Sequence, residues 1–546
     1  MKHRAPQIAY WIPTSLRRTF ETSKPFENPD SGRVARKGLS TDDNFRFLRS
    51  RWEVPGALVH SRDWPIILSG QKRSLFFADF SLVIEWFRDG LHLKAFTIGR
   101  YGNAGKRVFN EEWYFHPGLT WPLRGTNFSA SIVPEGAVFS GGGKMAFALR
   151  ADLLPLTSLF NSVVWDALVK LFAGKVGGVQ YEAGLIGKLP MPPIPASIAH
   201  DLGNAARRAW SLKRSVDTRI ETSHAFTLPA VLQVTGETLN ARAAAWAERV
   251  RNVEAELAAI QAEIDERCFD LYGIDEADRR AIREGFGTVA VESTDEPDTE
   301  ETDSDDETTA EAEADAASLV REFLSWSLGV ACGRFDLRLA TGERALPLEP
   351  EPFDPLPVCS PGMLTGEDGL PITLDAWRAG GRQPPDDSRR SPDVRGLTPA
   401  GSPGSNRAGP IDIPWNGLLV DNPGHPLDIE ARVQQVLKII WPDCCEAIEH
   451  EACEMLGVKT LREYFRKPAL FFADHLKRYS KSRRQAPIYW PLATASGSYT
   501  LWVYYPVVYT QRQRRRPLHG MRFAPELEAG FICQTSMERD DVRRDC

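Results

Sequence analysis

The sequence lacks several features that assign a protein to a class at once. No apolar run approaches the roughly 20 residues that span a bilayer, and the opening segment MKHRAPQIAYWIPTS lacks the apolar core of a secretory signal. The eight cysteines are scattered without a CxxC pair, and the ten histidines show no ligand spacing. We therefore expect a cytoplasmic protein with neither a zinc site nor a disulfide framework.

Nucleotide-binding and nuclease motifs are missing as well. The glycine-rich segments at 101–107 and 141–144 do not match the phosphate-binding loop GxxxxGK followed by Ser or Thr. No acidic-acidic-lysine cluster falls on strand-like sequence, where a metal-dependent nuclease needs one. These absences leave binding as a more plausible role than metal-dependent or nucleotide-dependent catalysis.

Positive charge is concentrated in two regions, although the net charge of the 546 residues is −7. Residues 292–315 hold 13 carboxylates and no Lys or Arg, so the remainder carries +6. Residues 1–200 carry +9 and residues 456–520 carry +11. Two basic regions on either side of an acidic run suggest a polyanionic partner, although basic faces are also common as solvated surfaces.

Aromatic and basic residues are interleaved between Lys106 and Phe147. Flat rings beside guanidinium or amide groups are what proteins use to stack on bases and to reach base edges. The alternative is an aromatic core surrounded by solvated basic residues, and composition does not separate the two. The residues concerned are Phe109, Trp113, Tyr114, Phe115 and Trp121, with Lys106, Arg107, Arg124 and Asn127 among them.

The length allows roughly three or four domains, and the pattern of short strands and longer helices predicts an α+β fold without a complete Rossmann domain. We expect a long helix at 238–272 between a mixed region and a helical C-terminal domain. The predicted segments are an extended entry (1–37), a mixed target-recognition-like region (38–195), a helical spacer (196–290), an acidic disordered linker (291–316), an irregular Pro/Gly-rich region (317–416), a helical domain ending in a β-hairpin (417–505) and an atypical basic tail (506–546).

Several local patterns give sharper expectations for the first half of the chain. The cluster Ser40 to Asp43 predicts a helix cap, followed by a helix with Phe45, Leu48 and Trp52 on one face. The segment LVIEWFRDGLHLKAF predicts two strands joined by an Asp89-Gly90 turn. Residues 153–172 predict one amphipathic helix, and a further helix is expected at about 201–222.

The second half is predicted from helix periodicity and capping. Apolar residues of 238–272 are spaced by three and four, which predicts either a partner within the chain or a dimer stripe, and we favour the former. A small helix is expected at 317–335. Asp428 predicts a cap for a helix that buries Ile429, Val433, Leu437 and Ile440. The last ordered piece predicts a hairpin that turns at 495–498.

Four phrases together resemble a known family. They are KGLSTDDNFRFLRSRWEV, WYFHPGLTWPLRGTNFSASIVPEGAVFS, ETSHAFTLP and KSRRQAPIYWPLATASGSYTLWVYY. Their order is similar to the C-terminal half of adenine-specific DNA methyltransferases of phage-defence systems, first the BREX phage-growth-limitation X methyltransferase, with DISARM and type IIG enzymes as neighbours. The resemblance covers residues 8–290 and 417–505, and it implies a DNA-recognition region and a C-terminal domain that closes on DNA.

The catalytic half of that family has no counterpart in this sequence. The family binds S-adenosylmethionine through a glycine-rich turn and holds the flipped adenine with Asn-Pro-Pro-Tyr or Asn-Pro-Pro-Phe. Asn28-Pro29-Asp30 and Asn422-Pro423-Gly424 lack the second proline and the aromatic. We therefore expect no catalytic residue and no cofactor site. The Arg-rich sequence after Tyr505 suggests a frame change near 505–510 and a start internal to a longer ancestral gene.

The resemblance implies a function and a set of DNA contacts. We expect the specificity half of an N6-adenine methyltransferase, inactive alone, that binds double-stranded DNA and a protein partner, either a catalytic methyltransferase subunit or another defence-system protein. The alternative is a protein-interaction module that uses helix 238–272 and the acidic linker. The expected DNA-binding residues are Arg49, Arg51, Lys106, Arg107, Trp113, Tyr114, Trp121, Arg124, Asn127, Lys477, Arg478, Lys481, Arg483 and Arg484.

Overall fold

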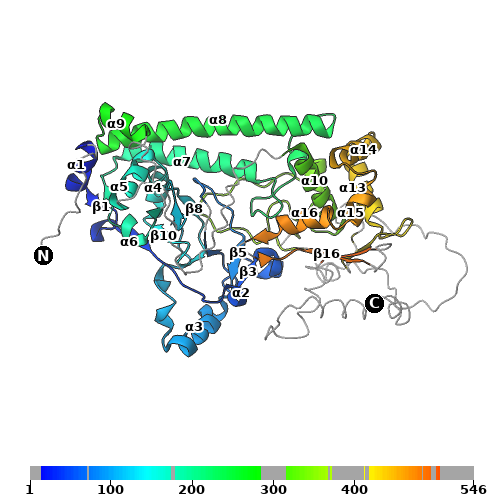
Figure 1. Cartoon of the computed structure of the whole chain (residues 1–546), viewed down its shortest axis with the longest axis horizontal. Helices are drawn as coiled ribbons and strands as arrows, with labels where there is room; N and C mark the ends of the chain where they lie inside the picture. The colour runs from blue at the N-terminus through cyan, green and yellow to red at the C-terminus, as the bar shows by residue number, and fades with distance from the viewer. Residues whose placement is uncertain are drawn as a thin grey trace, which may run out of the picture.

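The chain folds into two lobes that share one long helix (Figure 1). The computed structural model describes residues 14–70, 73–173, 179–284, 315–366, 369–371, 411, 413, 417–481, 484–493 and 500–504. We call residues 14–217 and 251–284 the sheet lobe, and residues 218–250 and 315–504 the helical lobe, because each part packs around its own hydrophobic core. Residues 291–314 of the predicted linker 291–316, the basic tail and the turn at 495–498 lie outside the described residues, whereas Asp315 and Ala316 already cap and begin α10.

Short strands give the sheet lobe its framework. A four-stranded antiparallel sheet has the order β2 (Val34–Arg36), β10 (Met145–Phe147), β6 (Gly118–Thr120) and β8 (Ser131–Val133). Among the named strands that the structure describes, only β4 and β9 pair in parallel. The α+β fold class is therefore confirmed, and the described part contains no doubly wound sheet. The remaining pairs are β1 (Lys24–Pro25) with β12 (Pro190–Met191), β3 (Leu48–Ser50) with β5 (Leu82–Ile84), β4 (Ile67–Leu68) with β9 (Val138–Phe139), and β7 (Arg124–Gly125) with β11 (Val179–Gln180).

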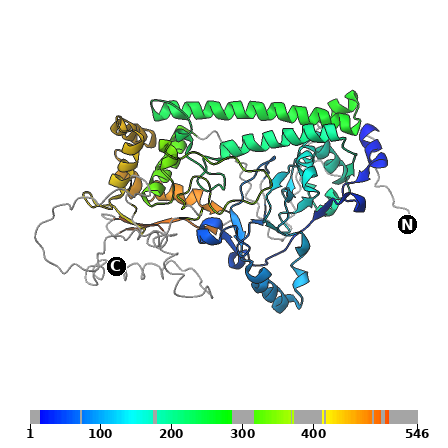
Figure 2. The same ribbon diagram turned by 180° about the vertical axis from the view of Figure 1, so that it is seen from behind.

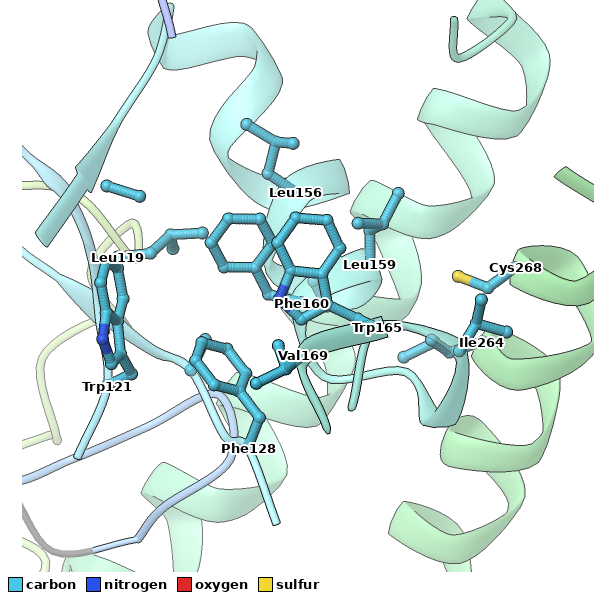
Figure 3. Packing of buried hydrophobic residues seen from close by; sticks show 14 of the residues in the cluster. Leu119, Trp121, Phe128, Leu156, Leu159, Phe160, Trp165, Val169, Ile264 and Cys268 are labelled. Carbon is cyan, nitrogen blue, oxygen red and sulfur yellow. The ribbon is translucent and has the colours of Figure 1, made fainter. Parts of the chain in front are cut away.

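Seven helices that the structure describes complete the sheet lobe, and Figure 3 shows how aromatic rings fill the space between them and the sheet. Trp121, Phe128, Phe160 and Trp165 form one group, with Phe160 and Trp165 stacked at 4.4 Å. The helices are α1 (Thr14–Thr22), α2 (Asn44–Phe47), α3 (Phe87–Tyr101), α4 (Arg150–Phe160), α5 (Val163–Ala173), α6 (Ala183–Ile186) and α7 (Ala196–Asp217).

The single helix expected at 153–172 is wrong, because α4 and α5 meet at a 76° bend. The buried Asn161 side chain accepts from the amide of Ala130 and donates to its carbonyl, at 2.7 and 2.9 Å. Ser162 then starts α5 by accepting from the amide of Trp165. These side-chain bonds hold Asn161 and Ser162 in place at the bend between the two helices. Within the described ranges no single helix is long and apolar enough to cross a membrane.

Helix α8 (Leu239–Tyr272) begins at the predicted position, capped by Thr238. It lies along the top of both lobes with α7 beside it (Figures 1 and 2). Its first turns pack into the helical lobe through Leu239 and Trp246, and its last turns pack into the sheet lobe through Ile264 and Cys268. The expectation of a partner within the chain is therefore confirmed. Helix α9 (Glu276–Arg283) follows.

Two expectations for the sheet lobe are wrong. Helix α2 is a single turn, capped by Asp43, and strand β3 follows at once, so Phe47 is buried while Phe45 is 69% exposed. The segment after β5 is helix α3 and not the second strand of a hairpin. Arg88, Asp89 and Gly90 all have positive φ, but they bend the start of α3, where Gly90 packs against the Trp86 ring. Helix α3 projects from the side opposite α8 (Figure 1).

The helical lobe has the elements that its sequence predicts. Asp428 caps α13 through the amide of Ala431, and Ile429, Val433 and Leu437 are buried while Ile440 is half-buried. Strands β16 and β17 pair as the predicted hairpin, and β13 adds a third strand. The elements are α10 (Ala316–Ala331), α11 (Arg338–Thr341), β13 (Leu418–Val420), α13 (Ile429–Ile440), α14 (Cys445–Leu456), α15 (Leu461–Arg466), α16 (Phe471–Arg478), β14 (Ser480–Lys481), β15 (Arg484–Gln485), β16 (Tyr489–Ala493) and β17 (Thr500–Tyr504).

Candidate nucleic-acid interface

Three cationic side chains converge at one edge of the four-stranded sheet. Arg36 of β2 is in register with Met145 of β10, so Lys37 and Lys144, each one residue beyond that pair, are neighbours across the two strands. Burial lowers the pKa of Lys144 most, and the positive charges of Lys37 and Arg124 lower it further. Lys37 and Arg124 therefore each lie within electrostatic reach of Lys144.

One carboxylate offsets this group. Lys144 Nζ lies 3.3 Å from Glu182 Oε1, and the Lys144 side chain is 2% exposed. Glu182 is half-exposed and also accepts a hydrogen bond from Gln180 Nε2 at 2.6 Å. Lys37 and Arg124 are exposed, and no carboxylate of the described residues lies within ion-pair distance of either. The edge therefore keeps an excess of two positive charges.

Glycines allow two turns to close beside these cations. A Cβ on Gly143 would lie 2.4 Å from the Leu68 carbonyl oxygen, and one on Gly141 would lie 3.1 Å from Lys37 Cε. The amides of Gly141 and Gly143 already donate to carbonyl groups of the chain, to Leu39 and Ser140. The turn is consequently not an anion nest, and the positive potential comes from the side chains.

The positive surface continues onto the loop at 103–110. Asn110 Nδ2 donates to the Lys37 carbonyl at 2.8 Å, which holds this loop against the end of β2. Arg107 pairs with Asp42 at 2.6 Å, and its guanidinium lies 4.4 Å from the centre of the Tyr101 ring. Lys106 is exposed. We call Lys37, Lys106, Arg107, Arg124 and Lys144 the basic strip: five cations against the two carboxylates Asp42 and Glu182.

The aromatic residues expected on this surface are in fact core residues. Tyr114 is 2% exposed and donates to the Phe109 carbonyl at 2.9 Å, and Trp121 is 1% exposed and donates to the Tyr181 carbonyl at 3.0 Å. Trp113 is half-buried against Phe147. With their polar atoms bonded to buried backbone, Tyr114 and Trp121 are not placed to stack on a base.

Arg124 and Asn127, by contrast, lie at the surface as expected. Both are exposed, on β7 and directly after it. Asn127 Oδ1 accepts from Lys170 Nζ at 2.8 Å, so this amide oxygen faces a cation and its nitrogen is turned away from that bond. The stretch from 106 to 147 thus separates into a basic surface and an aromatic core.

Two of the five cations expected in the helical lobe are neutralised by carboxylates. Although burial by itself lowers the pKa of Arg478, the carboxylates of Glu221 and Asp474 raise it, at 3.4 and 2.9 Å from the guanidinium. Arg484 pairs with Glu53, and its side chain is 11% exposed. The expectation that Arg478 and Arg484 are free for phosphates is therefore corrected, because both are already paired.

The remaining expected cations differ in their exposure and in the groups that they contact. Lys477 is exposed, Lys481 is half-buried, and Arg483 lies outside the described residues. Arg49 binds its own turn, donating to the carbonyl groups of Phe45 and Leu48. Arg51 donates to the Thr222 carbonyl at 2.5 Å, and burial lowers its pKa. Arg51 is consequently a structural residue between the lobes, not a groove contact.

The phrase ETSHAFTLP, residues 221–229, forms the junction between the lobes. His224 contacts the Asp79 carboxylate at 2.9 Å through Nδ1 and at 3.0 Å through its amide. Ser223 donates to Asp217, and burial together with the charge of Asp79 raises the pKa of Asp217 to about 7. Buried polar groups of this phrase therefore tie the lobes together. Within the described ranges no three His, Cys, Asp or Glu residues form a group that could hold a metal.

Sequence reasoning missed Lys37, Lys144 and Phe45. Lys37 and Lys144 each border glycine, at Lys37-Gly38 and Gly143-Lys144, and such a border is the signal that marks a cation beside a tight turn. Their adjacency depends on strand register, which the sequence does not show. The side chains of Phe45 and Phe47 point in different directions because α2 is only one turn long, and the sequence does not show that length.

Comparison with protein-family models and with curated protein sequences gives no match. Among solved structures, the chain is similar to the type IIL restriction-modification enzyme MmeI in complex with DNA, with 12% sequence identity and a TM-score of 0.31. The similarity covers 48% of this chain and 36% of that one. The chain thus spans about a third of that protein's length, and a likeness so remote assigns no function by itself.

Proposed function

We propose that this chain is the DNA-binding specificity half of an adenine-specific N6 DNA methyltransferase of a phage-defence or restriction-modification system. The observation that carries the proposal is the basic strip, where five cations from separate loops and strands meet only two carboxylates. Surfaces of this kind bind the phosphate backbone of a duplex, because each neutralised phosphate releases counterions.

In this proposal, some residues position the duplex and a different residue reads its base sequence. Lys37, Lys106 and Arg124 contact phosphates and fix the register of the duplex without reading its sequence. Asn127, exposed beside Arg124, is the candidate for a base edge, since its amide nitrogen is turned away from the bond to Lys170 and can donate to a base acceptor. The resemblance of the surrounding phrases to the recognition half of methyltransferases supports this assignment.

We propose further that the chain does not methylate DNA alone. The family it resembles uses S-adenosylmethionine and an Asn-Pro-Pro-Tyr or Asn-Pro-Pro-Phe segment, and neither that segment nor the glycine-rich turn occurs in this sequence. A separate catalytic polypeptide supplies both in this proposal. The protein-interaction alternative is not favoured, because the apolar residues near both ends of α8 are packed inside the two lobes.

The proposal is tested by measuring duplex binding of the purified chain over a range of salt concentrations. We expect the logarithm of the association constant to fall linearly with the logarithm of salt, with a slope of about −3 if Lys37, Lys106 and Arg124 each contact one phosphate. No binding at low salt, or binding independent of salt, contradicts the proposal.

The catalytic part of the proposal needs a second measurement. Labelled methyl transfer from S-adenosylmethionine to DNA is followed with the chain alone, with a candidate catalytic subunit alone, and with both. We expect N6-methyladenine only from the mixture. Transfer by the chain alone shows that it carries its own active site and overturns this part.

A further inference from the structure

The Phe45 ring is exposed although hydrogen bonds hold its backbone in place. The Phe45 side chain is 69% exposed. The other exposed phenylalanine in the described part of the sheet lobe is Phe87, at 45%. Asp43 caps the turn that carries it, and Arg49 Nη1 donates to the Phe45 carbonyl at 2.8 Å. The backbone is therefore fixed while the ring stays in water.

The other lobe contributes to the same position. The guanidinium of Arg484 lies 4.9 Å from the centre of the Phe45 ring, and Arg484 is itself held by an ion pair with Glu53. A second contact joins the lobes beside this ion pair: Trp52, the residue before Glu53, donates through Nε1 to the carbonyl of Ala486 at 2.6 Å. Phe45 thus stands where the sheet lobe and the helical lobe meet, with a cation placed over its ring.

Phe45 also lies at the end of the basic strip. Asp42, which pairs with Arg107 of the strip, is three residues earlier, and three residues span at most about 11 Å. A duplex whose phosphates lie on the strip therefore passes close to the ring. A flat apolar ring with a fixed backbone suits contact with a base face and not with a phosphate.

We propose that Phe45, backed by Arg484, is a wedge that stacks on a base at an opened step of the bound duplex. This inference rests on the proposed function, and it adds the kind of DNA that the site prefers. DNA with an abasic site or a mismatch already has the gap that the ring fills, so the chain binds such DNA more tightly than an intact duplex of the same sequence.

The test compares an intact duplex with one that carries a central abasic site, using the full chain. Wild type is expected to prefer the abasic duplex, and Phe45→Ala is expected to lose that preference, by roughly 5- to 150-fold from the usual contribution of one stacked base. Phe45→Trp keeps the preference, because the indole supplies a ring face. Phe87→Ala is the matched control, since Phe87 is also exposed but has only its neighbour Arg88 near its ring.

A fluorescent 2-aminopurine opposite the abasic site reports stacking directly. We expect the wild-type chain to change its fluorescence and Phe45→Ala to leave it unchanged. If Phe45→Ala weakens binding to both duplexes equally, the wedge proposal is wrong although the basic strip still binds DNA. The wedge proposal is also wrong if Phe45→Ala changes self-association of the chain and leaves DNA binding unchanged. If wild type binds neither duplex, the proposed function fails first.

Discussion

The two basic regions of the chain differ in what their cations touch. In the sheet lobe, Lys37, Lys106 and Arg124 lie at the surface with no ion-pair partner among the described residues. In the helical lobe, Arg478 and Arg484 are paired with Glu221 and Glu53, which come from distant parts of the chain. The second region has the higher net charge in the sequence, yet two of its described arginines are held in ion pairs.

The difference shows that a run of like charges has two possible uses. Carboxylates brought in by the fold hold Arg478 and Arg484 in the junction, whereas Lys37, Lys106 and Arg124 have no such partner among the described residues. Salt dependence of DNA binding and stability of the fold should therefore separate cleanly between the two regions. Four substitutions test that separation.

The largest effect is expected at Asp217, in the junction beside Asp79, Ser223, Arg219 and Lys481. Its folded-state pKa of about 7 lies above the unfolded value, so the folded state keeps a proton that the unfolded state loses. Its contribution to stability is present at acid pH and is lost as pH rises from about 4 to 7, by up to about 4 kcal/mol. Asp217→Asn should remove this loss.

The measurement is denaturant unfolding of wild type and Asp217→Asn at a series of pH values. The difference in free energy of unfolding between wild type and Asp217→Asn gives the contribution of Asp217 alone. It leaves out His224 and His475, because burial lowers their pKa values and their titration changes stability in the opposite direction. Asp443→Asn, at an exposed carboxylate, is the control. A difference that does not vary with pH contradicts the expectation.

The next largest effect is expected from Glu221→Gln. Glu221 is 5% exposed and bonds both Ser325 and Arg478. Removing one member of a buried pair leaves the other charge without compensation, at a cost of about 3 kcal/mol. Chemical denaturation should show that loss, while the salt slope of DNA binding stays as in wild type. A changed slope would mean that the junction also contacts phosphate.

The sheet lobe should behave in the opposite way. Lys37→Gln with Arg124→Gln removes two exposed cations of the basic strip and should reduce the magnitude of the salt slope by about 1.8, with unfolding unchanged. Arg18→Gln with Arg280→Gln, on α1 and α9, makes the same change in net charge away from the strip. Equal effects of the two double variants would show that net charge alone matters.

The smallest effect is expected from Tyr114→Phe, which separates the aromatic core from the basic surface within one stretch. The variant loses the hydrogen bond to the Phe109 carbonyl and should lower the free energy of unfolding by about 1 kcal/mol. DNA binding at every salt concentration should match wild type. Weaker binding without loss of stability would restore Tyr114 as a DNA contact.

Some elements could be predicted because their causes are local. Thr238 and Asp428 cap their helices where the sequence places them, and the spacing of Ile260, Ile264 and Cys268 gives the buried face of α8. The expected hairpin at Asp89-Gly90 failed because three residues of positive φ suit a bent helix start as well as a turn. Local signals did not distinguish the two.

The candidate site was predictable only in part. Lys106, Arg107, Arg124 and Asn127 are named by their stretch of sequence, and the structure places all four at or near the surface. Lys144 joins them only through the register of β10 on β2. Tyr114 and Trp121 are buried because residues from other parts of the chain pack around their rings, and composition does not show that packing.

The sequence by itself determined the α+β composition, the long capped helix and the positions of the two basic regions, since propensity, capping and charge act over a few residues. Only the tertiary structure decided which cations remain available. Arg484 meets Glu53 across 431 positions of sequence, and Lys37 meets Lys144 across a sheet. Pairing at such separations depends on where strands and lobes come to lie, and that placement leaves Lys37 and Arg124 at the surface while it holds Arg484 in the junction.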